Sequence, residues 1–182
     1  MKKILLVMLF FSSQIVHGQE IISGSFDDIV DARKTNLVID WSKMKIAGMD
    51  PEDWIRYRQE TKPEIDARIE LEDQLKPLLH QMFLPNCNKK TYKRNFILVR
   101  NKVTPYTLII SPLEIDAKGN NICDYDFTET ESGKSLLKIE MKTKGGLIGS
   151  ISNLWRDAFE LAGDEFGDYL DSKLKKARKK KN

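Results

Sequence analysis

The clearest structural pattern in the sequence lies in Tyr106–Lys144, YTLIISPLEIDAKGNNICDYDFTETESGKSLLKIEMKTK. It contains three runs in which apolar and polar residues alternate, separated by the turn-forming sequences AKGNN and ESGKS. Alternation with a period of two is typical of a strand with one face on a core and the other in water. Because short turns join neighbouring strands, the stretch predicts an antiparallel meander.

The first of these runs has a bend. Tyr106, Leu108 and Ile110 share one parity, and the apolar residues that follow Pro112 share the other. A proline cannot donate a backbone hydrogen bond to a neighbouring strand. We therefore expect this strand to be bent and to lie near an edge of the sheet.

A glycine-rich loop, KTKGGLIGS, follows the meander at residues 142–150 and precedes a helical pattern. Strand, glycine loop and helix is the order found in phosphate-binding loops. The spacing here is G-G-x-x-G rather than G-x-G-x-x-G, and no further strand is expected after the helix. We therefore interpret Gly145 and Gly146 as a sharp turn, with Ser150 or Ser152 as the cap of the helix.

The helical pattern itself spans residues 151–174 and carries a broad apolar stripe. A stripe of this width predicts a helix that is buried along one side. Gly163 and Gly167 are four residues apart within it, and glycines inside a helical pattern usually have a packing reason. We expect the helix to lie close against the sheet at these two positions.

The region before the meander combines strands and helices. Residues 20–34 are polar and weakly patterned, and no element is predicted there. Residues 36–46, NLVIDWSKMKI, alternate but change parity midway, which predicts a bent strand. A helix is expected to begin at Pro51, with Asp50 as its N-cap, and to end near Pro63.

A second helical pattern follows, from Ile65 to Met82. It should kink or restart at Pro77, because a proline inside a helix removes one hydrogen bond. Residues 85–90, PNCNKK, contain turn formers and predict the end of the helical region. Residues 96–100, FILVR, predict a short strand.

The chain begins with MKKILLVMLFFSSQIVHGQE, a pattern typical of a secretory signal. The apolar run from Ile4 to Phe11 is too short to span a bilayer, and no cysteine near the expected cleavage site invites lipidation. We expect a signal peptide at residues 1–18, a single domain at residues 19–174, and no transmembrane span in the mature chain. The protein is therefore predicted to be periplasmic or secreted.

Charge is distributed unevenly along the mature chain. Seven basic residues and no acidic residue lie from Lys173 onward; without these seven and the two lysines of the signal, the 30 basic residues fall to 21, against 27 acidic residues. Residues 175–182 thus form a basic C-terminal tail, which suits an anionic envelope surface or remains a solvated helix end. Secretion argues against nucleic acid. The tail residues predicted to contact an anionic surface are Lys175, Lys176, Arg178, Lys179, Lys180 and Lys181.

The two cysteines, Cys87 and Cys123, both lie in the mature chain. An oxidising compartment permits a disulfide between them, and a loop of that length would be stabilised by about 4 kcal/mol on the chain-entropy argument. Cys123 has the parity of inward-facing residues, so a buried thiol is the alternative. Spacing alone leaves the two possibilities open.

Little in the sequence indicates catalysis. His80 is the only histidine of the mature chain, and no G-x-S-x-G motif occurs. Asp and Asn residues crowd the predicted hairpin at residues 116–126, but their spacing differs from that of a calcium-binding EF-hand loop. We predict no catalytic residue, no cofactor and no metal site.

Three segments together carry a resemblance to a known family: YTLIISPLEIDAKGN, SGKSLLKIEMKTKGG and ISNLWRDAFELAGDEFGDYLDSKL. With the upstream NLVIDWSKMKIAGMDPEDW, they resemble an uncharacterised family of secreted proteins and lipoproteins of Gram-negative bacteria. The resemblance implies an envelope α/β domain similar to those of the curli-secretion and Tol N-terminal type, with no catalytic residues to carry over. This chain lacks the lipobox cysteine of many such proteins, so the resemblance does not extend to membrane anchoring.

Together these observations predict an α+β domain: a mixed, mostly antiparallel sheet of about five strands with helices packed on one face. The first function hypothesis is a non-enzymatic envelope protein that binds another protein or a cell-envelope component. The alternative is a small periplasmic hydrolase using carboxylates, which a pocket that gathers Asp124 or Asp126 with His80 would favour. A ligand cavity between sheet and helix is a third possibility, and the oligomeric state is left open.

Overall fold

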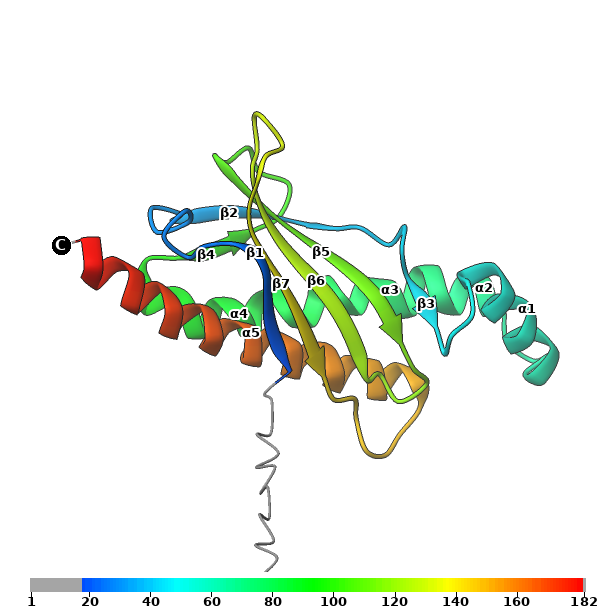
Figure 1. Cartoon of the computed structure of the whole chain (residues 1–182). Helices are drawn as coiled ribbons and strands as arrows, with labels where there is room; N and C mark the ends of the chain where they lie inside the picture. The colour runs from blue at the N-terminus through cyan, green and yellow to red at the C-terminus, as the bar shows by residue number, and fades with distance from the viewer. Residues whose placement is uncertain (1–17, 182) are drawn as a thin grey trace, which may run out of the picture.

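A seven-stranded mixed sheet with helices on one face makes up the domain (Figure 1). The computed structural model describes residues 18–181. The strands run in the order β1-β7-β6-β5-β2-β4, and β3 pairs with β5 beside this path. The predicted α+β class and the mostly antiparallel pairing are confirmed, with more strands than expected. The predicted signal peptide lies outside the described residues except for Gly18.

The predicted meander forms the centre of the sheet. It consists of β5 (Tyr106–Ile115), β6 (Asn121–Glu129) and β7 (Ser135–Thr143), paired antiparallel in sequence order. The alternating residues that face the helices are buried, and they are Leu108, Ile110, Cys123, Tyr125, Phe127, Leu137, Ile139 and Met141. The period-two pattern therefore marked the core face correctly.

The pairing is antiparallel at one edge of the sheet and parallel at the other. β1 (Gln19–Gly24) pairs antiparallel with β7, and its side chains are mostly exposed, which is why no alternation marked it in the sequence. At the other edge β2 (Lys34–Ile39) pairs in parallel with both β5 and β4 (Ile97–Val99). The short β3 (Lys45–Ile46) continues along β5 after the bend that the parity change predicted.

Pro112 lies in a central strand, so the prediction that β5 is near an edge is wrong. Register with β2 ends at Ile110, and register with β3 begins at Glu114. The strand also changes register with β6 between Pro112 and Glu114. The proline therefore occupies a gap between two neighbouring strands, where a missing N–H leaves no ladder bond unmade.

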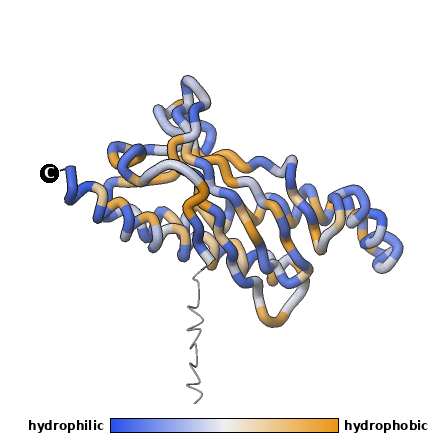
Figure 2. The backbone as a smooth tube through the Cα atoms, in the orientation of Figure 1, coloured by the Kyte–Doolittle hydropathy of each residue, from blue (hydrophilic) through white to orange (hydrophobic). Residues whose placement is uncertain are grey.

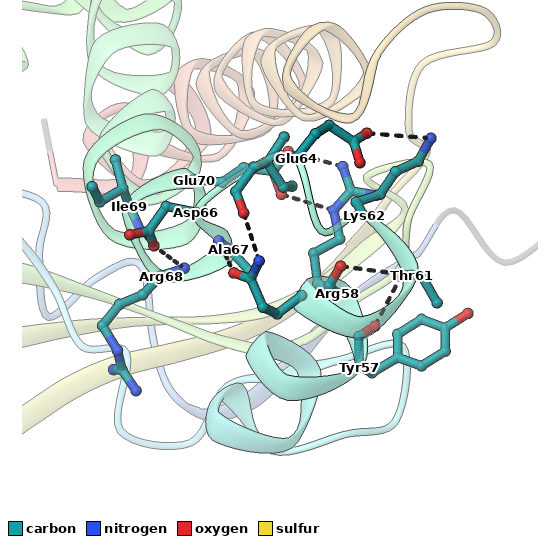
Figure 3. Close-up of polar contacts among 12 residues, drawn as sticks. Tyr57, Arg58, Thr61, Lys62, Glu64, Asp66, Ala67, Arg68, Ile69 and Glu70 are labelled. Carbon is teal, nitrogen blue, oxygen red and sulfur yellow. Dashed lines mark hydrogen bonds and ion pairs between the residues drawn. The ribbon is translucent and has the colours of Figure 1, made fainter.

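The first helix, α1 (Pro51–Thr61), begins at the predicted residue. The chain then turns into α2 (Ala67–Ile69), where the Asp66 side chain accepts hydrogen bonds from two backbone N–H groups at 3.0 Å. Figure 3 shows how this corner is held: the Arg58 guanidinium donates to both oxygens of Glu70, at 2.8 and 2.9 Å. A bidentate pair of this kind fixes both distance and orientation.

From α2 the chain stays helical as far as Arg94 and passes through two π-helical segments. Its elements are η1 (Glu70–Leu75), α3 (Lys76–Leu78), η2 (Leu79–Phe83), α4 (Leu84–Thr91) and η3 (Tyr92–Arg94). The prediction that residues 85–90 form a turn is wrong, because they belong to α4. Each π-helical segment immediately precedes a turn that contains a proline, Pro77 or Pro85, and its wider spacing removes the clash of the proline ring with the carbonyl four residues earlier.

The long final helix, α5 (Ile151–Lys181), packs against α4, η2 and the core face of the sheet. Phe166 stacks on Tyr125 of β6 with ring centroids 4.4 Å apart. The two glycines face the neighbouring helix rather than the sheet: a Cβ atom at Gly163 would lie 2.6 Å from the Phe83 carbonyl oxygen, and one at Gly167 would lie 3.0 Å from that of Cys87. The predicted close approach exists, but its partner is a helix.

The loop between β7 and α5 corrects another prediction. Neither Gly145 nor Gly146 has a positive φ, so the sharp-turn interpretation is wrong. Glycine is needed at position 145 because a Cβ atom there would lie 1.9 Å from the Lys118 carbonyl oxygen in the β5–β6 turn. The predicted cap is confirmed, since Ser150 Oγ accepts from the Asn153 N–H at 3.3 Å.

Candidate functional site

The basic C-terminal residues form the last two turns of α5 instead of a separate tail. Ala177 is buried, so the helix is still packed on the domain at this point. The neighbouring contact surface includes Val30 and Ala32, before β2, and Arg94, at the end of η3. The basic residues are therefore presented by a fixed helix end.

Arg178 fixes this helix end to the domain. Its guanidinium donates to the carbonyl oxygens of Val30 at 3.1 Å and Ala32 at 3.0 Å, and to that of Arg94. Burial, and next the charge of Arg33, lower the pKa of Arg178 from its usual value. Arg178 was predicted to contact an anionic surface, but its guanidinium instead attaches the helix end to the domain.

The other cations of the helix end are exposed. Lys181 forms an ion pair with Asp31. Among residues 18–181, no ion pair involves the remaining four lysines, and these are Lys175, Lys176, Lys179 and Lys180. Their charges are available to an anionic partner.

Cations from two other segments lie beside this helix end. Arg33 and Lys34 at the start of β2, with Lys93 of η3, line an open cleft of about 460 Å³ that also includes the exposed ring of Tyr92. Arg178 links α5 to the two segments that line the cleft, because it bonds to Ala32, next to Arg33, and to Arg94, next to Lys93. We call the basic end the surface made by residues 175–181, Arg33, Lys34 and Lys93.

Sequence analysis found the helical part of the basic end and missed the rest. Arg33 and Lys34 lie in a region with no predicted element, and Lys93 follows a segment that was predicted to be a turn. Each is an isolated surface cation in the sequence. Only the sheet order, which places β2 beside β4 at one edge, brings them together.

Comparison with known proteins yields weak structural likenesses, three of which follow. A PelC dodecamer from Paraburkholderia phytofirmans matches with a TM-score of 0.43 and 7% identity, covering 84% of this chain and 96% of that chain. A variant of that dodecamer gives 0.39 and 8% over 84% and 94%; a DUF330 protein from Xanthomonas campestris gives 0.35 and 8% over 58% and 65%. No family model and no curated protein matches the chain. Likeness at this level assigns neither a family nor a function.

The two cysteines are free thiols in the structure, which is the alternative that the sequence left open for Cys123. Cys87 belongs to α4 and Cys123 to β6, and both are buried. The Cys123 thiol donates to Asn121 Oδ1 at 3.5 Å. Burial raises the pKa of both thiols far above the usual value, so neither is reactive at neutral pH.

His80 lies apart from the carboxylates that the hydrolase hypothesis required. It lines a cleft of about 270 Å³ with Trp41, Lys76 and Arg100. Asp124 is paired with Lys138 at 2.7 Å, and Asp126 accepts from Ser135, both on the outer face of the sheet. The described residues therefore do not bring Asp124 or Asp126 into a pocket with His80.

His80 should make the free energy of unfolding depend on pH as the pH falls below about 6.5. Its Nδ1 is buried without a hydrogen-bond partner among residues 18–181, and burial, then Arg100, lowers its pKa. As pH falls below about 6.5, the unfolded chain gains a proton that the folded chain resists, so the free energy of unfolding decreases. We expect His80→Gln to flatten this part of the profile in urea titrations at several pH values. An unchanged slope would contradict the assignment.

Among residues 18–181, no helix is both long and apolar enough to cross a bilayer. Within the same range, no three His, Cys, Asp or Glu side chains are grouped so that they could hold a metal ion. In the same range, the basic end brings together cations from three segments of the chain, and we therefore treat it as the candidate functional site.

Proposed function

We propose that this is a non-enzymatic protein of the bacterial envelope, and that it binds an anionic component of the envelope surface through its basic end. The proposal rests on one observation. Exposed lysines without ion pairs on α5 lie next to cations from the start of β2 and from η3, and Arg178 holds these segments together.

Physical chemistry favours a surface or a polymer with many negative charges. The lysines are exposed, so water and salt screen each one strongly, and a single small anion would bind weakly. A densely charged surface instead attracts all of them at once, by about 1 kcal/mol for each cation near it. Such binding must weaken as ionic strength rises.

Substitution of the three most C-terminal unpaired lysines tests this proposal. We expect Lys176→Gln/Lys179→Gln/Lys180→Gln to bind anionic phosphatidylglycerol vesicles at least about tenfold more weakly in low salt, because about three favourable interactions are lost. Co-sedimentation with vesicles measures the effect. These side chains are exposed, so thermal unfolding should change little.

A matched variant separates the site from net charge. Lys43→Gln/Lys102→Gln/Lys134→Gln removes the same charge from exposed positions elsewhere. It should bind nearly as well as the wild type. Equal losses in the two variants, or no vesicle binding by any of the proteins, would reject the basic end as the binding site.

A further inference from the structure

The loop between β7 and α5 ends in two of the most exposed apolar residues of the domain. Leu147 is 93% exposed and Ile148 is 90% exposed. Figures 1 and 2 show the loop extending beyond the end of the sheet, with an apolar segment at its turn. We call residues 144–149 the apolar tip. Two adjacent large aliphatic side chains held in water are unusual and commonly mark a contact surface.

The base of the apolar tip is fixed. The Gly145 N–H donates to Asn120 Oδ1 at 2.8 Å, and the Asn120 side chain in turn donates to Asp116 at 2.6 Å. Trp155 of α5 donates from Nε1 to the Asp116 carbonyl oxygen at 3.2 Å. Because the loop is bonded to the β5–β6 turn and that turn to α5, Leu147 and Ile148 are held outward on a built support.

Cations surround this base. Lys118, Lys142 and Lys144 are exposed, and no ion pair involves them among residues 18–181. Three carboxylates lie near the same base. Those of Asp116 and Glu114 are partly buried and accept backbone hydrogen bonds, and the exposed Asp157 Oδ2 would lie 3.2 Å from a Cβ atom at Gly146. Among the fully exposed charges, three lysines therefore stand against one carboxylate. Exposed aliphatic residues next to exposed lysines match the layers of an anionic bilayer, with hydrocarbon inside and negative headgroups at the surface.

We propose that the apolar tip inserts Leu147 and Ile148 into the hydrocarbon boundary of an anionic bilayer, while Lys118, Lys142 and Lys144 contact its headgroups. The proposal rests on the proposed function only in placing the protein at the envelope. The two surfaces are separate, since the apolar tip precedes α5 and the basic end is its last part. At about 1.5 Å per residue, α5 is roughly 46 Å long, with the apolar tip before its start and the basic end at its last residues.

Serine substitutions test the contribution of the aliphatic side chains. Leu147→Ser/Ile148→Ser should weaken binding to vesicles of phosphatidylethanolamine and phosphatidylglycerol by at least about tenfold, and the loss should persist in high salt because burial of apolar area is not screened. The control, Val103→Ser/Leu161→Ser, alters two exposed aliphatic residues elsewhere and should bind as the wild type does. Equal binding by both variants would overturn the proposal.

A fluorescent label reports insertion directly. Ile148→Cys can be labelled selectively with an environment-sensitive dye, because Cys87 and Cys123 are buried. Vesicles should shift the emission to the blue and increase it, whereas a label at Val103→Cys should not respond. An unchanged emission at position 148 on vesicle-bound protein overturns the proposal, as does a lower oligomeric state of the serine variant with intact vesicle binding, which would assign the tip to self-association.

The two proposals fail in different ways. If the basic-end variant Lys176→Gln/Lys179→Gln/Lys180→Gln loses vesicle binding and the label at position 148 is silent, the proposed function stands and the apolar tip is rejected as an insertion site. If the label responds and the basic-end variant binds normally, the insertion proposal stands and the basic end is rejected.

Discussion

Replacing Gly163 by leucine should lower the free energy of unfolding by about 3 kcal/mol or more. A Cβ atom at this position would lie 2.6 Å from the Phe83 carbonyl oxygen and 3.0 Å from the Phe83 Cα atom. These atoms belong to the backbone of a packed helix and cannot turn aside as a flexible side chain can. The added side chain must therefore separate α5 from η2, and this separation also disturbs the stacking of Phe166 on Tyr125.

Urea denaturation of a short series of variants measures the effect. Gly163→Ala should be less severe, because its gain of about 1 kcal/mol in helix propensity offsets part of the clash. Glu160→Leu adds a comparable side chain to an exposed position of the same helix and should change stability by less than about 0.5 kcal/mol. A Gly163→Leu protein as stable as the wild type would show that the two helices do not approach as closely as the structure indicates.

The parts of the fold that could be predicted are those in which burial of one face of a strand or helix produces a regular pattern in the sequence. The alternation in β5, β6 and β7 follows directly from a sheet with one buried face, and the apolar stripe of α5 follows from burial along one side. The start of α1 was equally local, since Pro51 occupies its first position; Asp50 lies at the N-cap position, but its side chain makes no capping hydrogen bond.

The parts that sequence reasoning missed depend on distant neighbours. The residues of β1 bury little surface, and only the free edge of β7 makes them a strand. Pro112 is tolerated in the centre of the sheet because β2 and β3 leave a gap beside it. Residues 85–90 look like a turn, yet they remain helical where α5 packs on α4 and η2 accommodates the proline.

Part of the candidate site could likewise be predicted from the sequence, and part of it could not. The run of lysines at the end of the chain is visible in the sequence, whereas Arg33, Lys34 and Lys93 join it only through the order of the strands. Arg178 was grouped with the lysines because it has the same charge. Its hydrogen bonds to three backbone carbonyl groups attach the helix end to the domain. No local sequence pattern could have indicated this role.

Replacement of Arg178 by methionine should lower the free energy of unfolding by about 2–4 kcal/mol, because three carbonyl groups lose a charged donor. Methionine retains much of the apolar length of the side chain, so the loss reflects the guanidinium. Arg178→Lys should be intermediate, since one ammonium group cannot reach the carbonyl oxygens of Val30, Ala32 and Arg94 together. Thermal and urea unfolding measure the differences, and the exposed Lys179→Met is the matched control.

Truncation before Lys175 is a second test of whether the end of α5 stabilises the domain. If residues 175–182 were the tail that the sequence predicted, this deletion would leave folding nearly intact. The structure predicts a loss at least as large as that of Arg178→Met, because the buried Ala177 is removed as well. Arg178→Met should also weaken vesicle binding although every lysine remains, since the helix end is no longer held beside Arg33 and Lys93. Unchanged stability in both proteins would mean that the guanidinium does not hold this end together, and the basic end would then have to be treated as a solvated tail.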